Sequence, residues 1–148
     1  MSAVRLARAG DLAGIMALYR VLRPVDPELA PAQAGAAFAA ILEDDALSLV
    51  VCEHERILVA TCMLAVIQNF ASGARPFALL EHVVTLPRFR QQGFARLVLR
   101  YALELAWSKR CYKVILLSGA DRSEAHRLYE SVGFRGDLER GFVCKARD

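Results

Sequence analysis

The chain has 148 residues, a length that suits one domain; 55% of its residues are hydrophobic and 24% are charged. These proportions predict a soluble, well-packed globular protein and exclude intrinsic disorder. The formal net charge is +3, and no dense Lys/Arg tract accompanies it, so the charge does not predict a nucleic-acid partner. We therefore expect residues 1–148 to form a single domain.

Cysteine usage and the N-terminal region predict the compartment. No run of about 18 uncharged apolar residues occurs, and Arg8 and Asp11 interrupt the region where a signal peptide would need one. The four cysteines form no C-x-x-C pair, and three of them lie in apolar runs, which indicates buried free thiols. We expect no metal site, no membrane partner and a cytoplasmic location.

The N-terminal third predicts one strand and two helices. Residues 4–7 form the candidate strand, and Asp11 is expected to cap a helix that ends at Pro24. The second helix is expected to start at Pro31 and to run through Leu42.

A hairpin follows these helices. The runs 47–52 and 57–66 are almost continuously apolar, which is typical of strands covered on both faces. The polar residues 53–56 join them as a turn, and His54 is interpreted as a turn residue. His126, further along the chain, is interpreted as lying on a helix surface.

The second half continues the alternation of strands and helices, which predicts an α/β or α+β fold. The expected elements are a strand at 77–86, a helix at about 93–109, a strand at 114–117, a short helix capped by Asp121 or Ser123 and ended by Gly133, and a last strand at 142–145. Arg96, Arg100 and Glu104 recur every four residues and should form the exposed face of the long helix.

The loop before that long helix has the composition of an anion site. Its residues are Arg90, Gln91, Gln92, Gly93, Phe94 and Ala95. The first N–H groups of a helix have no partner within the helix and, with the helix dipole, carry about half a positive charge. Gly93 has no Cβ, so a diphosphate can approach the backbone, and Arg88, Arg90 and Arg96 add positive charge. The pattern matches neither a P-loop nor a G-x-G-x-x-G fingerprint.

Two motifs in this half resemble those of the Gcn5-related N-acetyltransferase (GNAT) superfamily. The loop matches the signature Q/R-x-x-G-x-G/A, which follows a strand and opens a helix in that superfamily. The segment from Ala125 to Phe134 matches a second signature, A-x-x-[LF]-Y-E-x-x-G-F. Both motifs occur in the order and at a separation typical of the superfamily, within the segment from Leu80 to Phe134.

The resemblance implies an α/β (α+β) fold with a mixed, mostly antiparallel, twisted sheet of about six to seven strands and about four helices on both faces. It implies acetyl-coenzyme A as co-substrate, with the diphosphate on the loop at 90–95 and Arg96. The strand ending near Leu86 should splay from the strand at 114–117, so that pantetheine pairs with the backbone of Val83, Val84 and Thr85. Arg122 departs from the asparagine common at its position and is a second candidate contact for coenzyme phosphate.

The resemblance also implies catalytic roles. Tyr129 corresponds to the tyrosine that protonates the leaving thiolate, and a phenol with a reference pKa of about 10 suits that task. The backbone N–H of Val84 or a near neighbour would bind the thioester oxygen. Glu81 and His82 are candidates for accepting the proton of the amine, with a slight preference for Glu81, and either is equally open to a structural role.

The acceptor is the least determined feature. Residues 110–116, and more loosely 81–84, are similar to segments of glucosamine-6-phosphate acetyltransferases, which suggests a small primary amine, for instance an amino sugar. A protein or peptide amine is an alternative, for which the acidic cluster at 43–45 is the one candidate groove. A non-catalytic acyl-coenzyme A-binding module is the other. The pattern also allows a homodimer through edge strands or the final strand.

Overall fold

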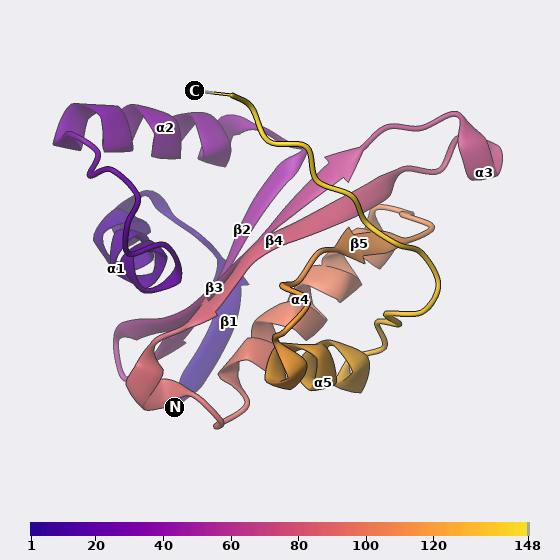
Figure 1. Cartoon of the computed structure of the whole chain (residues 1–148). Helices are drawn as coiled ribbons and strands as arrows, with labels where there is room; N and C mark the ends of the chain where they lie inside the picture. The colour runs from indigo at the N-terminus through magenta and orange to yellow at the C-terminus, as the bar shows by residue number, and fades with distance from the viewer. Residues whose placement is uncertain (148) are drawn as a thin grey trace. The chain divides into compact units, whose positions relative to one another are not determined.

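The computed structural model describes residues 1–147, in which five strands form one sheet in the order β1-β2-β3-β4-β5 (Figure 1). Their bounds are Ser2–Leu6, Leu47–His54, Ile57–Ile67, Phe77–Thr85 and Val114–Leu116. Neighbouring strands from β1 to β4 are antiparallel, and β4 and β5 are parallel. The mixed, mostly antiparallel sheet is confirmed, but the expected count of about six to seven strands is wrong for the described residues.

The difference arises at the C-terminal end, where the expected last strand at 142–145 has no ladder partner. Residues 141 to 147 form neither helix nor strand, and Phe142 and Val143 are 86% and 69% exposed. An apolar run is compatible with a strand, but a strand forms only where another strand accepts and donates its backbone hydrogen bonds. The sequence pattern could not reveal that this partner is absent.

In chain order the helices are η1 (Ala9–Asp11), α1 (Leu12–Leu22), α2 (Pro31–Glu43), α3 (Ala71–Ala74), η2 (Pro87–Phe89), α4 (Phe94–Ser108) and α5 (Ser123–Ser131). The four longer helices, α1, α2, α4 and α5, follow the sequence expectations, whereas the short η1, α3 and η2 were not expected. The chain divides into two compact units: the first runs from Met1 to Leu116 and the second begins at Leu117. The sheet lies in the first unit, and α5 lies in the second.

Within the first unit, helices cover both faces of the sheet. Ile15 and Leu18 of α1 and Phe38 of α2 share a core cluster with Leu49 and Val51 of β2. Because side chains alternate along a strand, Val50 and Cys52 face the other way.

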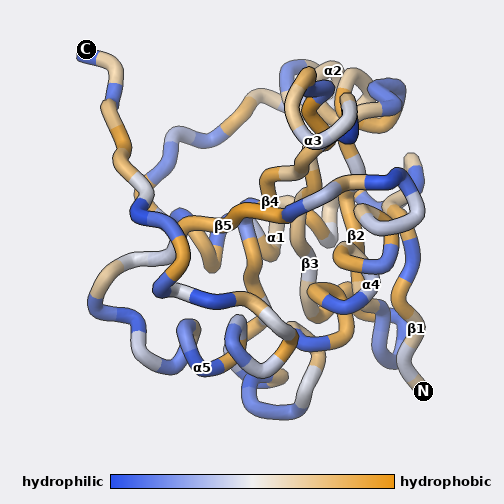
Figure 2. The backbone as a smooth tube through the Cα atoms, turned by 90° about the vertical axis from the view of Figure 1, so that its right-hand side faces the viewer, coloured by the Kyte–Doolittle hydropathy of each residue, from blue (hydrophilic) through white to orange (hydrophobic). Residues whose placement is uncertain are grey.

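That second face packs against α4. Cys62 lies opposite Val50 in the ladder, and its Sγ donates a hydrogen bond to the carbonyl of Val98 in α4 at 3.6 Å. Leu99 and Ala102 of α4 are fully buried, whereas Leu97, expected on the same apolar stripe, is 39% exposed. Both faces of the strands are therefore apolar, which explains their nearly continuous hydrophobic runs; in Figure 2 the hydrophobic colour follows β4 and β5.

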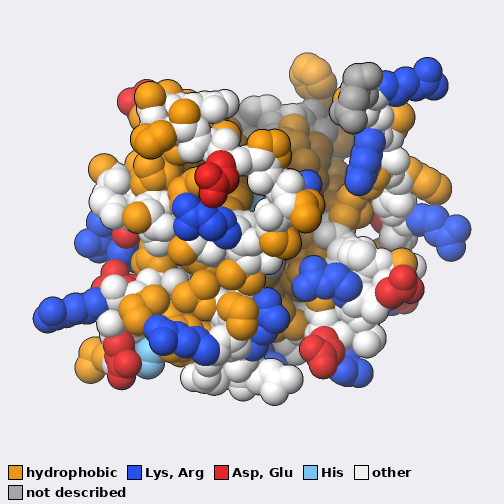
Figure 3. Space-filling view, turned by 60° about the vertical axis from the view of Figure 1, so that its left-hand side comes forward, with side chains coloured by type: hydrophobic (Ala, Val, Ile, Leu, Met, Phe, Trp, Pro, Cys, Tyr) orange, Lys and Arg blue, Asp and Glu red, His pale blue; other side chains and the backbone are white. Residues whose placement is uncertain are grey.

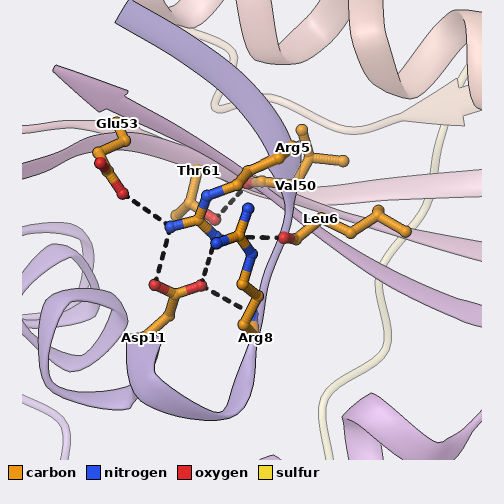
Figure 4. A network of polar contacts seen from close by, with 7 residues as sticks. All are labelled: Arg5, Leu6, Arg8, Asp11, Val50, Glu53 and Thr61. Carbon is orange, nitrogen blue, oxygen red and sulfur yellow. Dashed lines mark hydrogen bonds and ion pairs between the residues drawn. The ribbon is translucent and has the colours of Figure 1, made fainter.

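The start of α1 is held by an ion-pair network (Figure 4). Arg5 of β1 donates to both carboxylate oxygens of Asp11, at 2.6 and 3.1 Å, and to Glu53 of β2 at 2.8 Å. Asp11 precedes α1, as expected, but its side chain makes no capping bond to that helix. It instead accepts the N–H of Arg8 at 2.7 Å. Through Arg5, the network connects η1 to the strands β1 and β2.

The hairpin between β2 and β3 turns at Glu55 and Arg56, whose φ values of 50° and 66° are those of a tight two-residue turn. His54 is the last residue of β2 and is half-buried, so its interpretation as a turn residue is wrong. The pairing of β2 with β3 extends two residues beyond the apolar run, since a ladder does not require hydrophobic side chains at its end.

The second unit contains α5 and the segment that follows it. Arg122, rather than Asp121 or Ser123, is the residue that precedes the helix, and it makes no side-chain capping bond. Gly133 ends the helix as expected: its φ is 108°, and the next residue, Phe134, donates its N–H to the carbonyl of Tyr129. The ring of Phe134 also packs edge-on against Tyr129, with centroids 6.2 Å apart.

Basic and acidic side chains are interspersed with hydrophobic ones on the face of the molecule in Figure 3. Among the described residues, no helix has the length and apolarity needed to span a bilayer. The same part of the chain contains no group of three or more His, Cys, Asp or Glu side chains arranged for a metal ion. The positions of individual charged side chains therefore say more about a binding site than the net charge of the chain does.

Candidate functional site

The parallel ladder between β4 and β5 is short, and it ends inside β4. Ala78, Leu79 and Leu80 pair with Val114, Ile115 and Leu116, and no pairing continues beyond Leu80. Glu81, Val84 and Thr85 keep their pairing with β3, but residues 81–85 have no strand on their other edge among the described residues. The predicted separation of these two strands is present, and it leaves an edge of backbone donors and acceptors.

The direction of the backbone groups on this edge follows from one hydrogen bond. The N–H of Leu86 donates to the carbonyl of Val59 at 2.9 Å, on the β3 side. Donor direction alternates along an antiparallel strand, so the N–H of Val84, which pairs with Thr61, also points to β3 and that of Thr85 points to the open edge. The carbonyl of Thr85 accepts from Nε of Arg90 at 3.4 Å, which agrees with this assignment.

A β-bulge interrupts β4 where the two candidate bases lie. The register with β3 shifts between Thr61 and Met63, and His82 has a φ of 58°, a left-handed conformation that is unusual for a residue with a side chain. Before the shift, Glu81 lies opposite Met63, whose side chain packs against the α1 cluster. The expectation that the side chains of Glu81 and His82 point to opposite faces of the sheet therefore does not hold at the bulge.

Tyr19 of α1 lies beside both candidates. Its ring centroid is 5.4 Å from that of His82, and the two planes are inclined by 50°. Burial, with smaller contributions from Cys62 and Glu81, raises the pKa of Tyr19 to about 12. Glu81 itself is exposed and His82 is half-buried. A carboxylate, an imidazole and a protonated phenol thus meet on the α1 side of β4.

The loop between η2 and α4 presents free amides at the next corner of the fold. Gly93 precedes α4 with a φ of 88°, and its carbonyl accepts the first helical N–H, that of Leu97. In the described part of the chain, no protein acceptor is recorded for the N–H groups of residues 91–96. Such amides, together with the helix dipole, bind an anion.

The side chains around this loop fit a diphosphate. A Cβ built on Gly93 would have no heavy atom within 4 Å, so the approach to the backbone is open. Arg88, Arg90 and Arg96 are exposed, and the segment from 88 to 96 has no acidic residue. Arg88 lies over the ring of Phe89 at 4.7 Å, which fixes one of these cations beside the loop.

Tyr129 and Arg122 belong to the second unit. Tyr129 is buried, with 9% exposure, and lies on α5. Arg122 is exposed, and its carbonyl accepts the N–H of His126. His126 is half-buried rather than fully exposed, and its Nε2 lies 2.9 Å from the carbonyl of Gly119.

The first unit thus brings together most of the residues singled out in the sequence: Glu81, His82 and the backbone of 83–85 lead directly into the loop at 90–96. Sequence reasoning missed Tyr19 and the bulge at His82. A signal for Tyr19 existed, because Ile15, Leu18 and Tyr19 recur at helical spacing and so share the face of α1 that meets the sheet. No residue pattern indicated the bulge, because the left-handed position of such a bulge is usually glycine and is His82 here.

Comparisons with known proteins find relatives of this chain among acetyltransferases. A curated relative, glucosamine 6-phosphate N-acetyltransferase of Trypanosoma brucei brucei, is 35% identical over 79 residues, which are 53% of this chain and 51% of the relative. The match therefore spans about half the length of that protein. A solved structure from Agrobacterium tumefaciens str. C58, described as a candidate acetyltransferase, is 42% identical with a TM-score of 0.92, covering 97% of this chain and 99% of the other.

A third comparison concerns the fold alone. The aminoglycoside N-acetyltransferase AAC(6′)-Iy, solved in complex with CoA, has a TM-score of 0.83 at 19% identity, covering 100% of this chain and 96% of the other. The family model of the acetyltransferase (GNAT) family matches residues 15–134, which include the β4 bulge, the loop at 90–96 and α5. The chain belongs to the acetyltransferase (GNAT) family, whose members are acyltransferase enzymes that use acetyl-CoA.

Proposed function

We propose that this protein transfers the acetyl group of acetyl-CoA to the primary amine of a small molecule. The observation that carries the proposal is the edge of β4 after Leu80, which is free of β5 and leads into the amide-rich start of α4. One such edge can pair with the amides of pantetheine while the helix start binds the diphosphate. The half-length similarity to a glucosamine 6-phosphate N-acetyltransferase supports an amino sugar as the acceptor.

The coenzyme contacts we propose are the backbone of Val83, Val84 and Thr85 for pantetheine and residues 90–96 for the diphosphate. We assign the thioester oxygen to the backbone N–H of Val83, a near neighbour of Val84 that lies at the β4 bulge. Arg122 is assigned to coenzyme phosphate on its charge and on its place before α5. Negative charge that develops on the oxygen would be stabilised by this N–H in a fixed position.

The reaction proceeds by direct attack. The neutral amine nitrogen forms a bond to the thioester carbon, the carbon–sulfur bond breaks, and the thiolate leaves with its electron pair. The nitrogen loses a proton to Glu81 or His82, directly or through water, and the thiolate takes a proton from the Tyr129 hydroxyl. The products are an N-acetyl amine and CoA, so no further reactant is needed.

Coenzyme binding is tested first, by calorimetry and by thermal unfolding with acetyl-CoA. At a concentration one hundred times Kd, binding to the folded protein adds about 2.7 kcal/mol of stability. Absence of any heat or shift at millimolar acetyl-CoA contradicts the proposal.

Turnover is then measured as thiol release with amino sugars, polyamines, amino acids and peptides. Cys52, Cys62 and Cys111 are buried but Cys144 is exposed, so a Cys144→Ser background is needed to keep the thiol reagent off the protein. Release with glucosamine 6-phosphate or another amino sugar supports the acceptor class; release with peptides alone assigns the peptide alternative. Tight CoA binding without release from any amine identifies a non-catalytic binding module.

We also propose a cytoplasmic location, because the three buried cysteines are unpaired, as in reducing compartments. β1 and β5 are the two edges of the sheet and offer surfaces for a homodimer. Light scattering of the purified protein tests the second point, since a monomeric mass at working concentration contradicts it.

A further inference from the structure

His54, at the end of β2, packs against two phenylalanine rings from a distant part of the sequence. Its ring centroid is 5.1 Å from that of Phe94 and 6.0 Å from that of Phe89. Phe89 and Phe94 also contact one another edge-on, with centroids 6.1 Å apart. We call these three rings the His54 cluster; its geometry is that of favourable aromatic pairs.

The two phenylalanines lie at the two ends of the loop proposed to bind the diphosphate. Phe89 is the last residue of η2 and Phe94 is the first residue of α4, so the four residues 90–93 lie between them. His54 therefore contacts both ends of this loop from the neighbouring hairpin.

The loop needs such support because its backbone conformation is unusual. Gln91 has a φ of 60° and Gly93 a φ of 88°, and a residue with a side chain adopts such angles only when its surroundings hold it there. Hydrogen bonds of the loop are few and mostly local. The N–H of Arg90 donates to Pro87 at 3.3 Å and its Nε to Thr85 at 3.4 Å, Nε2 of Gln92 donates to Arg88 at 3.2 Å, and the carbonyl of Gly93 accepts from Leu97. All four of its residues, 90–93, are exposed.

The packing of His54 also has a cost. Its Nδ1 is buried and has no hydrogen-bond partner among the described residues. A buried nitrogen without a partner destabilises the folded state, so the contact cannot be explained by the imidazole's polarity. What His54 contributes to this contact is therefore the packing of its ring against Phe89 and Phe94.

We infer that His54 is a positioning residue for the coenzyme: its ring holds both ends of the loop at 90–93 so that the free amides face the diphosphate before CoA arrives. A loop that is correctly shaped in only a tenth of the molecules binds its ligand about tenfold more weakly, because apparent affinity scales with the competent fraction. The inference rests on the proposed coenzyme site but adds a residue outside it.

The test measures CoA affinity by calorimetry for wild type, His54→Ala and His54→Phe. His54→Ala should raise Kd for CoA about tenfold and speed amide hydrogen exchange in residues 90–95. His54→Phe retains a ring between Phe89 and Phe94 and should keep Kd within about twofold of wild type. It should also raise the thermal midpoint, since the unpaired nitrogen is gone.

A control separates positioning from general loss of stability. Phe38 lies in the core cluster formed with α1 and the sheet. Phe38→Leu should lower the stability of the fold without changing Kd for CoA. Wild-type affinity in His54→Ala overturns the inference and leaves the proposed function intact. Equal weakening in His54→Phe and His54→Ala also overturns it, because the nitrogen rather than the ring would then be required. Failure of the wild type to bind CoA contradicts the proposed function itself.

Discussion

The ring of Tyr19 in α1 lies 5.4 Å from the imidazole of His82 at the β4 bulge. This contact places a helix of the N-terminal region beside the residues proposed to handle the proton of the amine. Tyr19 is half-buried; a phenol is already protonated at neutral pH, and burial raises the pKa of Tyr19 still further from neutrality, to about 12. The α1 side of β4 is therefore the surface on which we expect the acceptor to bind.

The first prediction distinguishes the two candidate bases. Glu81→Gln should lower kcat about 100-fold, since a general base contributes on this order. His82→Asn should cause a smaller loss. The measurement is kcat of both variants with the best amine of the panel. The reverse order of effects would assign the proton to His82.

Tyr129→Phe should lower kcat at least about tenfold and leave Kd for CoA unchanged, because it removes a proton donor and retains the ring that packs on Phe134. Steady-state kinetics with calorimetry checks both parts. Tyr101→Phe is a suitable control, since Tyr101 is a half-buried tyrosine of α4 without a proposed role. An unchanged kcat would remove Tyr129 from the mechanism.

Gly93→Ala should weaken CoA binding at least about tenfold. The added methyl group meets no protein atom within 4 Å, so its effect on binding would come from the space that the diphosphate should enter. The left-handed backbone also makes alanine strained, at about 1–2 kcal/mol.

Gly73→Ala is the matched control for that strain. Gly73 also has a positive φ, of 71°, and open space around its Cβ position, but it lies in α3. Both variants should lose similar stability in urea, and only Gly93→Ala should lose affinity for CoA. Equal affinities would place the diphosphate elsewhere.

Asp11→Asn should destabilise the protein by about 1–3 kcal/mol at pH 7, because Arg5 loses a charged hydrogen-bond partner that is only 12% exposed. The hydrogen bonds from Arg5 hold the pKa of Asp11 below its ordinary 3.8. The folded chain thus releases this proton at lower pH than the unfolded chain, so the stabilisation is complete above about pH 4 and is lost as pH falls through the folded pKa.

Urea unfolding at pH 7 and pH 3 measures this effect. The wild type should lose the Asp11 contribution between the two values, and Asp11→Asn should show a flatter dependence. Asp26→Asn is the control, because the Arg23–Asp26 pair is exposed and should contribute nothing measurable. A pH dependence in Asp11→Asn identical to that of the wild type would contradict the account.

Local patterns were sufficient for most elements of this chain. The long helix expected at about 93–109 is α4 (Phe94–Ser108), and the runs at 47–52 and 57–66 lie within β2 and β3, because hydrophobic periodicity and turn residues act over short stretches of sequence. The strand, loop and helix around Gly93 were readable for the same reason. The motif alone was enough to indicate the family that the comparisons confirm.

Contacts between distant segments were decided by the tertiary structure alone. Whether 142–145 pairs as a strand depends on a partner elsewhere in space, and the position of Tyr19 beside His82 depends on how α1 packs on the sheet. The bulge at His82 arises from the register of β4 against β3, and His54 reaches Phe89 and Phe94 only through the fold. The sequence by itself determined most of the elements and the position of the loop proposed to bind the diphosphate, because those depend on neighbouring residues. Packing and strand register, which join residues far apart in the chain, determined which side chains surround that loop.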